Sequence, residues 1–289
     1  MFQEKQLSIK KIFEQLSKSI IKAFYLLLGG ISMYSIFVLG TAGSGKTTLV
    51  ASFLDWLRNK NLYTISINLD PGVINLPYTP EVDIRDYITI EQLMEKYNLG
   101  PNGALIMAAD LISTKLKEII NEIEDYDADY LLFDTPGQLE LFAFRTAGPY
   151  IVKRINRIKD NRTLILYLVD SSLCYLPSSL VSVLLLGQAI HYRFLIPQID
   201  VLSKIDILPQ NDFEKFVSWT DEPETLKDAI NEELSGIDRI IALKVADILV
   251  EHGSISSLLP VSGLKGTGLE NLYAMVQRVF AGGEDYRTE

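Results

Sequence analysis

The feature that most constrains the fold of this chain is a glycine-rich stretch, Gly40 to Thr47, which reads Gly-Thr-Ala-Gly-Ser-Gly-Lys-Thr. It matches the pattern GxxxxGK[ST], in which glycines allow positive φ angles and a close approach of the main chain to a ligand. The successive amide groups can then surround an anion at a helix N-terminus. Lys46 adds a positive charge for terminal phosphates, and the Thr47 hydroxyl is a suitable ligand for Mg²⁺.

The segments on either side of this motif decide whether it is a phosphate-binding loop or a plain glycine-rich turn. Residues 34–39 form a β-branched and aromatic run that is typical of a buried strand. Residues 48–58 place leucine and phenylalanine side chains on one helical face. Strand, loop and helix follow in the required order, so we predict a phosphate-binding set made of Gly43, Ser44, Gly45, Lys46, Thr47 and Thr48.

Composition limits the class of protein and its partners. The chain has 289 residues, 48% of them hydrophobic, which is enough for one large domain or two small ones. Its net charge is −10, which argues against direct binding of nucleic acid, because phosphate neutralisation needs a basic surface. The only cysteine, Cys174, excludes an internal disulfide and fits a reducing compartment, so we expect a cytoplasmic protein.

The first 32 residues form a leader in which lysines precede an apolar run. That run holds about a dozen uncharged residues, too few to span a bilayer, and we do not expect a membrane partner. We interpret Met33 as the natural start, with residues 1–32 read from an upstream start codon. An amphipathic interfacial helix and a membrane signal remain the alternatives.

From residue 33 onward, apolar runs alternate with helical segments, which predicts an α/β protein. Most of the runs are continuously apolar, as strands buried on both faces should be. We therefore expect the three-layer fold of P-loop NTPases, with a mostly parallel sheet covered by helices on both sides. The predicted strands are 34–39, 62–68, 130–134, 163–169, 197–202 and 258–262.

Two helical stretches interrupt this alternation. One covers about residues 90–124 and the other about residues 212–253. Neither has enough apolar sequence for a domain of its own, so we interpret both as insertions in a single domain of residues 33–281, followed by a tail of residues 282–289.

A second chemical motif follows the strand at 130–134, which ends in Asp134 and continues as Thr-Pro-Gly-Gln. An acidic residue at the end of a buried strand is typical of the carboxylate that supports Mg²⁺ beside a nucleotide. The amide of Gly137 could contact a γ-phosphate, and Gln138 could orient an attacking water. Asp70, after the second strand, could also order water, although an Asx turn before Pro71 is the simpler interpretation.

Base recognition should come from Ser203-Lys204-Ile205-Asp206, which follows the strand at 197–202. The Asp206 carboxylate can accept hydrogen bonds from guanine N1 and N2, which adenine cannot offer, and the Lys204 stem can cover the base plane. Asparagine or threonine is expected where Ser203 stands, so the loop has a shorter anchor. Ser262, after the last predicted strand, could close over the base.

Together these motifs resemble the GPN-loop GTPase family over about residues 33–281. The family is named for a Gly-Pro-Asn loop after the second strand, and here Gly100-Pro101-Asn102 lies between Asp70 and Asp134. The resemblance implies Mg²⁺-dependent hydrolysis of GTP by a homodimer in which Asn102 acts in the partner's site. Asp70 and Gln138 would then order the water, Lys46 would bind the phosphates, and Asp134 and Thr47 would support the metal. The chain looks like the single archaeal type.

The resemblance also implies a role in the assembly of protein complexes, because eukaryotic members are associated with RNA polymerase subunits. The leading hypothesis is a dimeric GTP hydrolase. The alternative is a nucleotide-gated assembly factor with negligible turnover, whose client would bind the helical stretch at 212–253. Metal insertases need a Cys/His cluster, and deviant Walker ATPases need a lysine where this chain has Thr41, so neither class fits.

Overall fold

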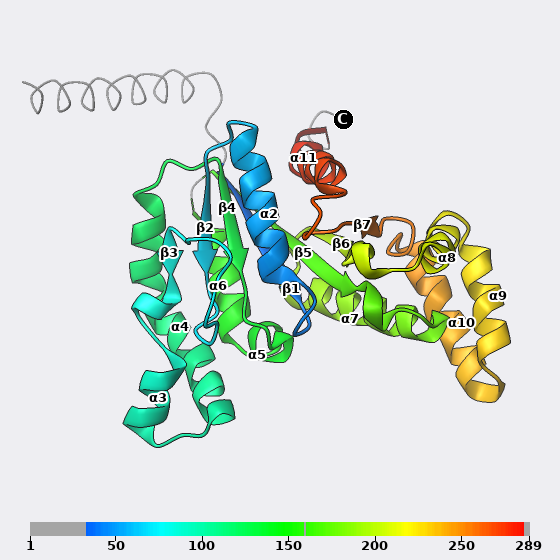
Figure 1. Cartoon of the computed structure of the whole chain (residues 1–289), viewed down its shortest axis with the longest axis horizontal. Helices are drawn as coiled ribbons and strands as arrows, with labels where there is room; N and C mark the ends of the chain where they lie inside the picture. Colours follow the sequence, from blue (N-terminus) through cyan, green and yellow to red (C-terminus); the bar gives the residue numbers. More distant parts are fainter. Residues whose placement is uncertain (1–32, 159, 286–289) are drawn as a thin grey trace, which may run out of the picture.

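The computed structural model describes residues 33–158 and 160–285, which form a parallel β-sheet between two layers of helices (Figure 1). The order of the strands in this part of the chain is β3-β2-β4-β1-β5-β6-β7, and all neighbouring strands are parallel. The three-layer α/β class predicted from the alternating pattern is therefore confirmed. The strands are β1 Met33–Gly40, β2 Thr64–Asn68, β3 Val82–Asp83, β4 Tyr130–Asp134, β5 Asn161–Asp170, β6 Gln198–Ser203 and β7 Leu259–Pro260.

Alternating residues of the central strands pack into two separate cores. Ile36 and Val38 of β1 face helices α2 (Lys46–Asn59) and α11 (Leu269–Asp285). Phe37 and Leu39 face the opposite layer, where the Phe37 ring stacks on Phe133 of β4 at 4.1 Å. Because both faces are covered, the strands read as continuous apolar runs in the sequence.

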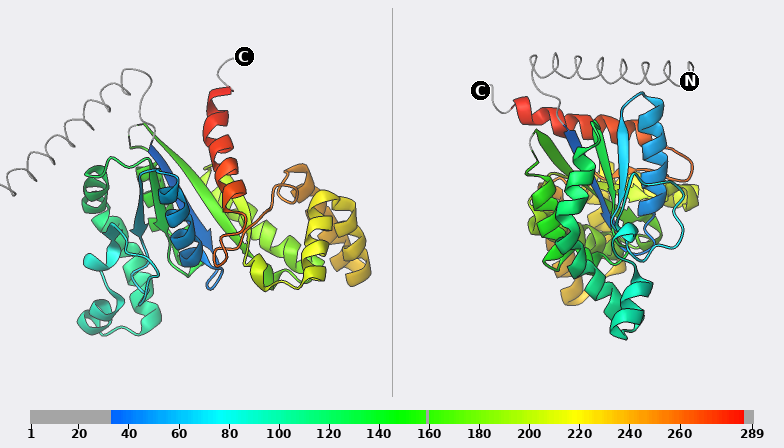
Figure 2. Two further views of the ribbon diagram at one scale, coloured as in Figure 1. Left: turned by 45° about the horizontal axis from the view of Figure 1, so that its top comes forward. Right: turned by 90° about the vertical axis from the view of Figure 1, so that its left-hand side faces the viewer.

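The helices of the second layer lie against the other face of the sheet and extend beyond both its edges (Figures 1 and 2). Helices α3 and α4 lie beside β3 and β2, and α8 to α10 lie at the opposite end of the sheet. The helices of this layer are α3 Ile90–Tyr97, α4 Pro101–Glu124, α5 Leu139–Ala143, α6 Ala147–Ile155, α7 Pro177–Phe194, α8 Gln210–Asp221, α9 Pro223–Glu233 and α10 Gly236–Glu251.

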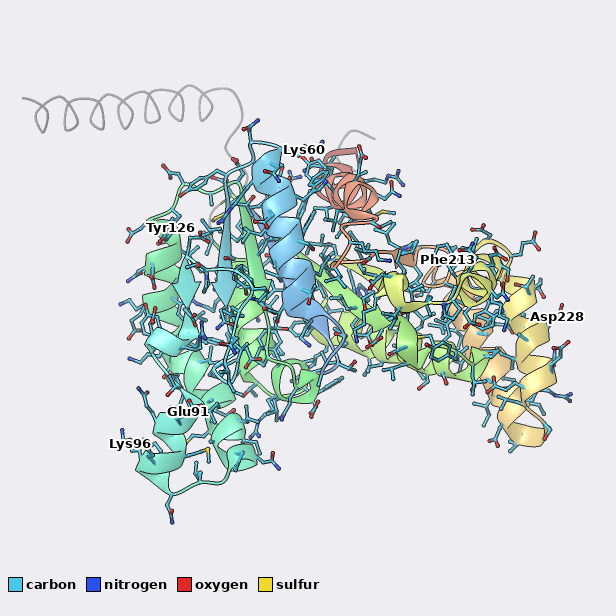
Figure 3. The ribbon with its side chains drawn as sticks, viewed as in Figure 1. Lys60, Glu91, Lys96, Tyr126, Phe213 and Asp228 are labelled. Atoms are coloured by element: carbon cyan, nitrogen blue, oxygen red, sulfur yellow. The ribbon has the colours of Figure 1, made fainter. Side chains whose placement is uncertain are left out.

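Helix α3 illustrates how sequence pattern sets helix position. The Thr89 side chain accepts a hydrogen bond from the Gln92 amide and so caps the helix N-terminus. Leu93 is buried against the core, whereas Glu91 and Lys96 point away from it (Figure 3). The helix ends at Tyr97 and is capped by Asn98, whose φ of 50° is left-handed.

Some element boundaries differ from the sequence prediction. Strand β2 begins at Thr64, because residues 60–61 form the turn that leaves α2 and residues 62–63 lead from it to the sheet. Strand β7 contains only Leu259 and Pro260, and proline cannot donate a further ladder bond. Strand β3 was not predicted, since two residues give no periodic signal.

The two predicted insertions are helical. Helices α3 and α4 fall within residues 90–124, and α8 to α10 occupy residues 210–251. The boundaries of the single domain stay a prediction. The leader of residues 1–32 and the last four residues of the tail lie outside the described residues. Across the described ranges, no helix has the length and apolar character needed to cross a membrane.

Candidate nucleotide site

The glycine-rich loop joins β1 to α2 at the carboxyl edge of the sheet. Gly45 caps α2 with a φ of 92°, which an L side chain rarely adopts. A Cβ at Gly40 would lie 2.6 Å from the Ser44 hydroxyl and 3.0 Å from the Leu168 carbonyl. The loop and strand β5 therefore leave no room for a larger residue at position 40. These two glycines fix the path of the loop onto the helix N-terminus.

Lys46 is folded back over the loop that it belongs to. Its Nζ donates hydrogen bonds to the Gly40 carbonyl at 3.0 Å and to the Thr41 carbonyl at 2.9 Å. Burial lowers the pKa of Lys46, and the nearby carboxylates of Asp134 and Asp70 oppose that effect. The lysine charge therefore lies beside both acidic residues that the sequence predicted for this site.

Asp134 is the last residue of β4 and is almost completely buried, with 1% of its surface exposed. One carboxylate oxygen, Oδ2, accepts a hydrogen bond from the Tyr78 hydroxyl at 3.0 Å. The other, Oδ1, is buried and has no hydrogen-bond partner. Burial raises the pKa of Asp134 to about 6, while the Thr47 and Tyr78 side chains and the Lys46 charge favour its ionised form.

These groups fit a magnesium ion. A buried carboxylate oxygen without a partner beside a threonine hydroxyl supplies two of the hard oxygen ligands that Mg²⁺ prefers. Within residues 33–158 and 160–285, no group of three His, Cys, Asp or Glu side chains comes together as a metal site. A magnesium site of this kind draws on one protein carboxylate together with substrate phosphates and water, so it does not need such a group.

Asp70, Gly137 and Gln138 line one cavity of about 190 Å³ next to the glycine-rich loop. Asp70 Oδ1 accepts a hydrogen bond from the Gly72 amide at 2.9 Å, which is the Asx turn expected before a proline. Its Oδ2 also accepts from the Gly137 amide at 3.3 Å. A Cβ at Gly137 would meet no atom within 4 Å, so the protein atoms alone do not require glycine there. Asp70 thus makes both the turn and the contact across the cavity.

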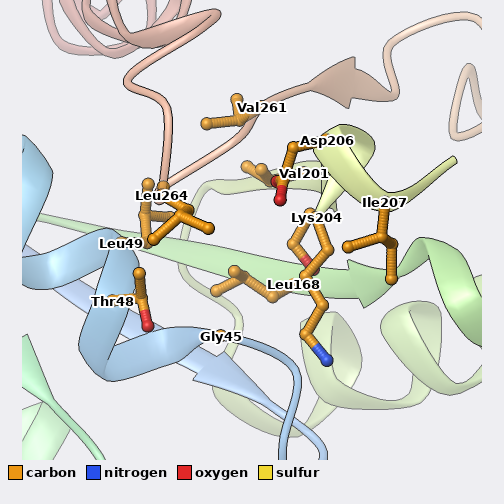
Figure 4. A pocket seen from close by; sticks show the side chains of 12 residues that line it. Gly45, Thr48, Leu49, Leu168, Val201, Lys204, Asp206, Ile207, Val261 and Leu264 are labelled. Atoms are coloured by element: carbon orange, nitrogen blue, oxygen red, sulfur yellow. The ribbon is translucent and has the colours of Figure 1, made fainter.

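A second cavity of about 340 Å³ opens beside the first turn of α2. Figure 4 shows the side chains of Thr48, Leu49, Lys204 and Asp206 around it, with the Lys204 amino group directed away from Asp206. Mostly apolar walls and one carboxylate suit a flat heterocyclic base with donor groups on one edge.

Ser203 ties the loop after β6 to the glycine-rich loop. Its Oγ donates to the Ser44 carbonyl at 2.8 Å and lies 3.2 Å from the Val169 carbonyl. The serine is buried, so no water competes for these contacts. The shorter side chain at this position therefore keeps a direct anchor.

The loop predicted to recognise the base is also held at Lys204 and Asp206. The Ser262 hydroxyl donates to Asp206 Oδ1 at 2.5 Å, and Lys204 Nζ donates to Asp170 Oδ2 at 2.8 Å. Lys204 has a left-handed φ of 59°, and its carbonyl accepts a hydrogen bond from Ser171. Burial alone would raise the pKa of Asp170, but the bonds from Lys204 and Ser172 hold it below its usual value.

Asn102 lies in the first turn of α4, where Gly100 is the N-cap and Pro101 the first helical residue. Its side chain is exposed, and it is not among the described residues that line the cavity beside Asp70. The turn between α3 and α4 extends beyond the sheet (Figure 1). Asn102 thus precedes Leu105, which does line that cavity, by about one helical turn, but it does not itself form part of the cavity wall.

Two residues of the site were missed by the sequence analysis. Tyr78 lies in the segment 76–80, where a tyrosine between prolines gave no sign of a distant carboxylate partner. Asp170 ends β5 in the same way as Asp134 ends β4, and this shared position at a strand end was a usable signal. Two arginines form ion pairs with carboxylates: Arg85 pairs with Asp83, and Arg145 pairs with Asp110.

The fold and the two cavities define a P-loop nucleotide-binding protein of the three-layer α/β class. Comparison with known proteins narrows that class. Residues 38–282 match the family described as "Conserved hypothetical ATP binding protein". The chain is 31% identical over 242 residues to GPN-loop GTPase PAB0955 of Pyrococcus abyssi, covering 83% of this chain and 94% of that protein.

A solved structure agrees. The crystal structure of PAB0955, described as a GTPase in apo form, matches with a TM-score of 0.76 and 30% identity, covering 86% of this chain and 98% of that one. GPN-loop GTPase 1 of Dictyostelium discoideum is 31% identical over 257 residues, covering 87% of this chain. The chain belongs to the GPN-loop GTPase family, a family of enzymes named for acting on GTP. It spans 62% of the Dictyostelium protein and 66% of its Saccharomyces cerevisiae relative.

Proposed function

We propose that this protein binds GTP and hydrolyses its γ-phosphate anhydride with Mg²⁺, as a homodimer in the cytoplasm. The single observation that carries the choice of GTP is the position of Asp206, a half-buried carboxylate on the wall of the cavity beside the first turn of α2. Guanine presents N1–H and N2–H donors to such a carboxylate, and adenine does not.

The residues around the smaller cavity support hydrolysis. In phosphoryl transfer the protein mainly positions the reactants and stabilises charge. The loop amides and Lys46 would bind the phosphates, while Asp70 and Gln138, which line one cavity, would orient water for in-line attack. Thr47 and Asp134 would hold Mg²⁺, which when bound neutralises the charge on the phosphates. The other predicted contacts are Gly43, Ser44, Gly45, Thr48, Gly137, Ser203, Lys204 and Ser262.

The position of Asn102 supports a two-subunit site. The residue is exposed at the start of a long helix and does not line the cavity beside Asp70, which the same helix reaches with Leu105. A dimer that brought this turn to the partner's Gln138 would complete the site without any new catalytic group. Family resemblance favours the same arrangement.

Substitution Asp206→Asn tests the choice of nucleotide. Xanthine carries a carbonyl where guanine has its N2 amino group, so an asparagine amide can donate to it. We expect GTP affinity to fall at least roughly tenfold, because a hydrogen bond to a charged acceptor is lost, and XTP affinity to rise. Asp228→Asn, on an exposed face of α9, is the matched control and should bind GTP normally. Equal affinity of the unmodified protein for ATP and GTP would reject the assignment.

A nucleotide-gated assembly factor is the second candidate, and an apolar surface favours it. A cavity of about 310 Å³ lies between α7 and α10, and its rim includes Leu185, Tyr192 and Ile248, each at least half exposed. Exposed apolar side chains around a hollow suit a hydrophobic segment of a protein client. Cross-linking in a cell lysate should then recover a client in a nucleotide-dependent manner. Equal recovery with GTP and with GDP would count against gating.

A further inference from the structure

The segment between β2 and β3 passes over the end of β4 and bonds Asp134 at both its backbone and its side chain. The Leu69 amide donates to the Asp134 carbonyl at 2.8 Å, and Tyr78 contacts the carboxylate. Tyr78 is half-buried, and its ring packs against the core that contains α2. Its hydroxyl donates to Asp134 Oδ2 at 3.0 Å. Thr47 of the glycine-rich motif and Asp134 at the end of β4 are the proposed magnesium ligands. Tyr78, from a separate part of the chain, is thus a third residue at this site.

The hydrogen bond distinguishes the two oxygens of Asp134. Oδ2 is engaged by Tyr78, whereas Oδ1 is buried and has no hydrogen-bond partner. A buried carboxylate oxygen without a partner is costly unless a ligand satisfies it. Because a carboxylate can rotate about its last side-chain bond, a donor on one oxygen also fixes the direction of the other.

The segment that carries Tyr78 is itself fixed at two further points. At its start, Asp70 accepts hydrogen bonds from the amides of Gly72 and Gly137. Farther along, the Arg85 guanidinium donates to the Val73 carbonyl at 3.2 Å while it pairs with Asp83 at 2.6 Å. The tyrosine therefore reaches Asp134 from a supported loop.

We propose that Tyr78 is a positioning residue of the magnesium site: it holds one oxygen of Asp134 so that the other faces the cation beside Thr47. This inference rests on the proposed function, because it requires Mg²⁺ at the nucleotide. It assigns Tyr78 no contact with the substrate. Removing such a supporting hydrogen bond typically weakens metal binding roughly 10- to 100-fold.

The test is the substitution Tyr78→Phe, which removes only the hydroxyl. Mg²⁺ is titrated into the full chain bound to a fluorescent GDP, and GDP affinity is measured separately in EDTA. We expect the half-saturating Mg²⁺ concentration to rise at least roughly tenfold, with GDP affinity in EDTA within about twofold of the unmodified protein. The matched control is Tyr87→Phe, whose hydroxyl bonds Glu122 at 2.7 Å outside the site and should change neither quantity.

A double substitution checks that the effect passes through Asp134. In an Asp134→Asn background, Tyr78→Phe should shift Mg²⁺ affinity by less than about twofold, because the carboxylate that it orients is gone. A full tenfold effect in that background would overturn the proposal.

Three further results would contradict it. Unchanged Mg²⁺ affinity in Tyr78→Phe would show that the hydroxyl is not needed, and tighter binding would show that it competes with the cation. Loss of GDP affinity in EDTA would show that the hydroxyl supports the loop instead. Each of these leaves the proposed function standing. An unmodified protein that binds GDP without any response to Mg²⁺ would overturn both.

Discussion

The Ser203 hydroxyl donates a hydrogen bond to the Ser44 carbonyl at 2.8 Å, and this bond joins the base-recognition loop to the phosphate-binding loop. Ser44 lies in the loop between β1 and α2, Ser203 is the last residue of β6, and the two meet at the carboxyl edge of the sheet. This bond holds the proposed guanine and triphosphate sites in one geometry, although the expected asparagine or threonine is absent at position 203.

Substitution Ser203→Ala should therefore weaken GTP binding by roughly five- to tenfold, because it removes this bond and leaves a buried carbonyl without a donor. Nucleotide affinity measured by fluorescence titration checks this. Ser218→Ala is a suitable control, since that hydroxyl bonds only its own helix at the surface. An unchanged affinity for GTP in Ser203→Ala would mean that the anchor is dispensable.

Substitution Asn102→Ala should leave GTP binding intact and slow hydrolysis at least roughly tenfold, as expected for loss of one transition-state contact. The trans arrangement allows a sharper test by subunit mixing. Lys46→Ala protomers lack a working phosphate site but keep Asn102, so a mixed dimer with an Asn102→Ala protomer contains one complete site.

An equal mixture of the two impaired variants should regain roughly a quarter of the normal activity, because random pairing makes half the dimers mixed and each mixed dimer has one complete site of two. Each variant alone should stay slow. No recovery, in a mixture whose subunit exchange is verified by mass spectrometry, would contradict the trans role of Asn102.

The burial of Asp200 leads us to predict that the free energy of unfolding falls as the pH rises. It lies on β6 and is 6% exposed, and burial raises its pKa to about 6 despite a 2.7 Å hydrogen bond from Gln198. Because the folded-state pKa is above the unfolded value near 4, the neutral form stabilises the fold at low pH, and this contribution is lost as the pH rises through about 6.

Substitution Asp200→Asn should thus raise stability at pH 8 by on the order of 2 kcal/mol and have little effect at pH 4. The new amide could also donate to Gln198 Oε1, which has no partner. Urea unfolding across this pH range measures the difference. Asp228→Asn, on the outer face of α9 (Figure 3), is the control and should show no such trend. A constant difference between Asp200→Asn and the unmodified protein at all pH values would contradict the burial argument.

The sequence predicted the fold best where the spacing of apolar residues directly reflects burial against the sheet. The run at residues 34–39 and the face of Leu49, Phe53, Leu54 and Leu57 predicted β1 and the buried side of α2, because burial on a sheet requires those periodicities. The phosphate motif at residues 40–47 and the base motif at residues 203–206 are equally local, since each is one contiguous run of the sequence.

Contacts between distant segments could not be predicted in this way. Tyr78 and Asp134 are brought together only by the path of the β2–β3 connection, and a lone tyrosine carries no mark of its partner. The serine at position 203 lacked the expected side chain, and its anchor became visible only from its burial against the Ser44 carbonyl. The proposed role of Asn102 depends on a second protomer, which no single chain specifies.

The most direct test of the central claim is GTP turnover by the purified chain with Mg²⁺ and a large excess of ATP. A guanine-specific hydrolase should release phosphate from GTP at a rate that ATP does not suppress and that EDTA abolishes. Turnover that falls in proportion to the ATP excess, or no turnover at all, would contradict the claim.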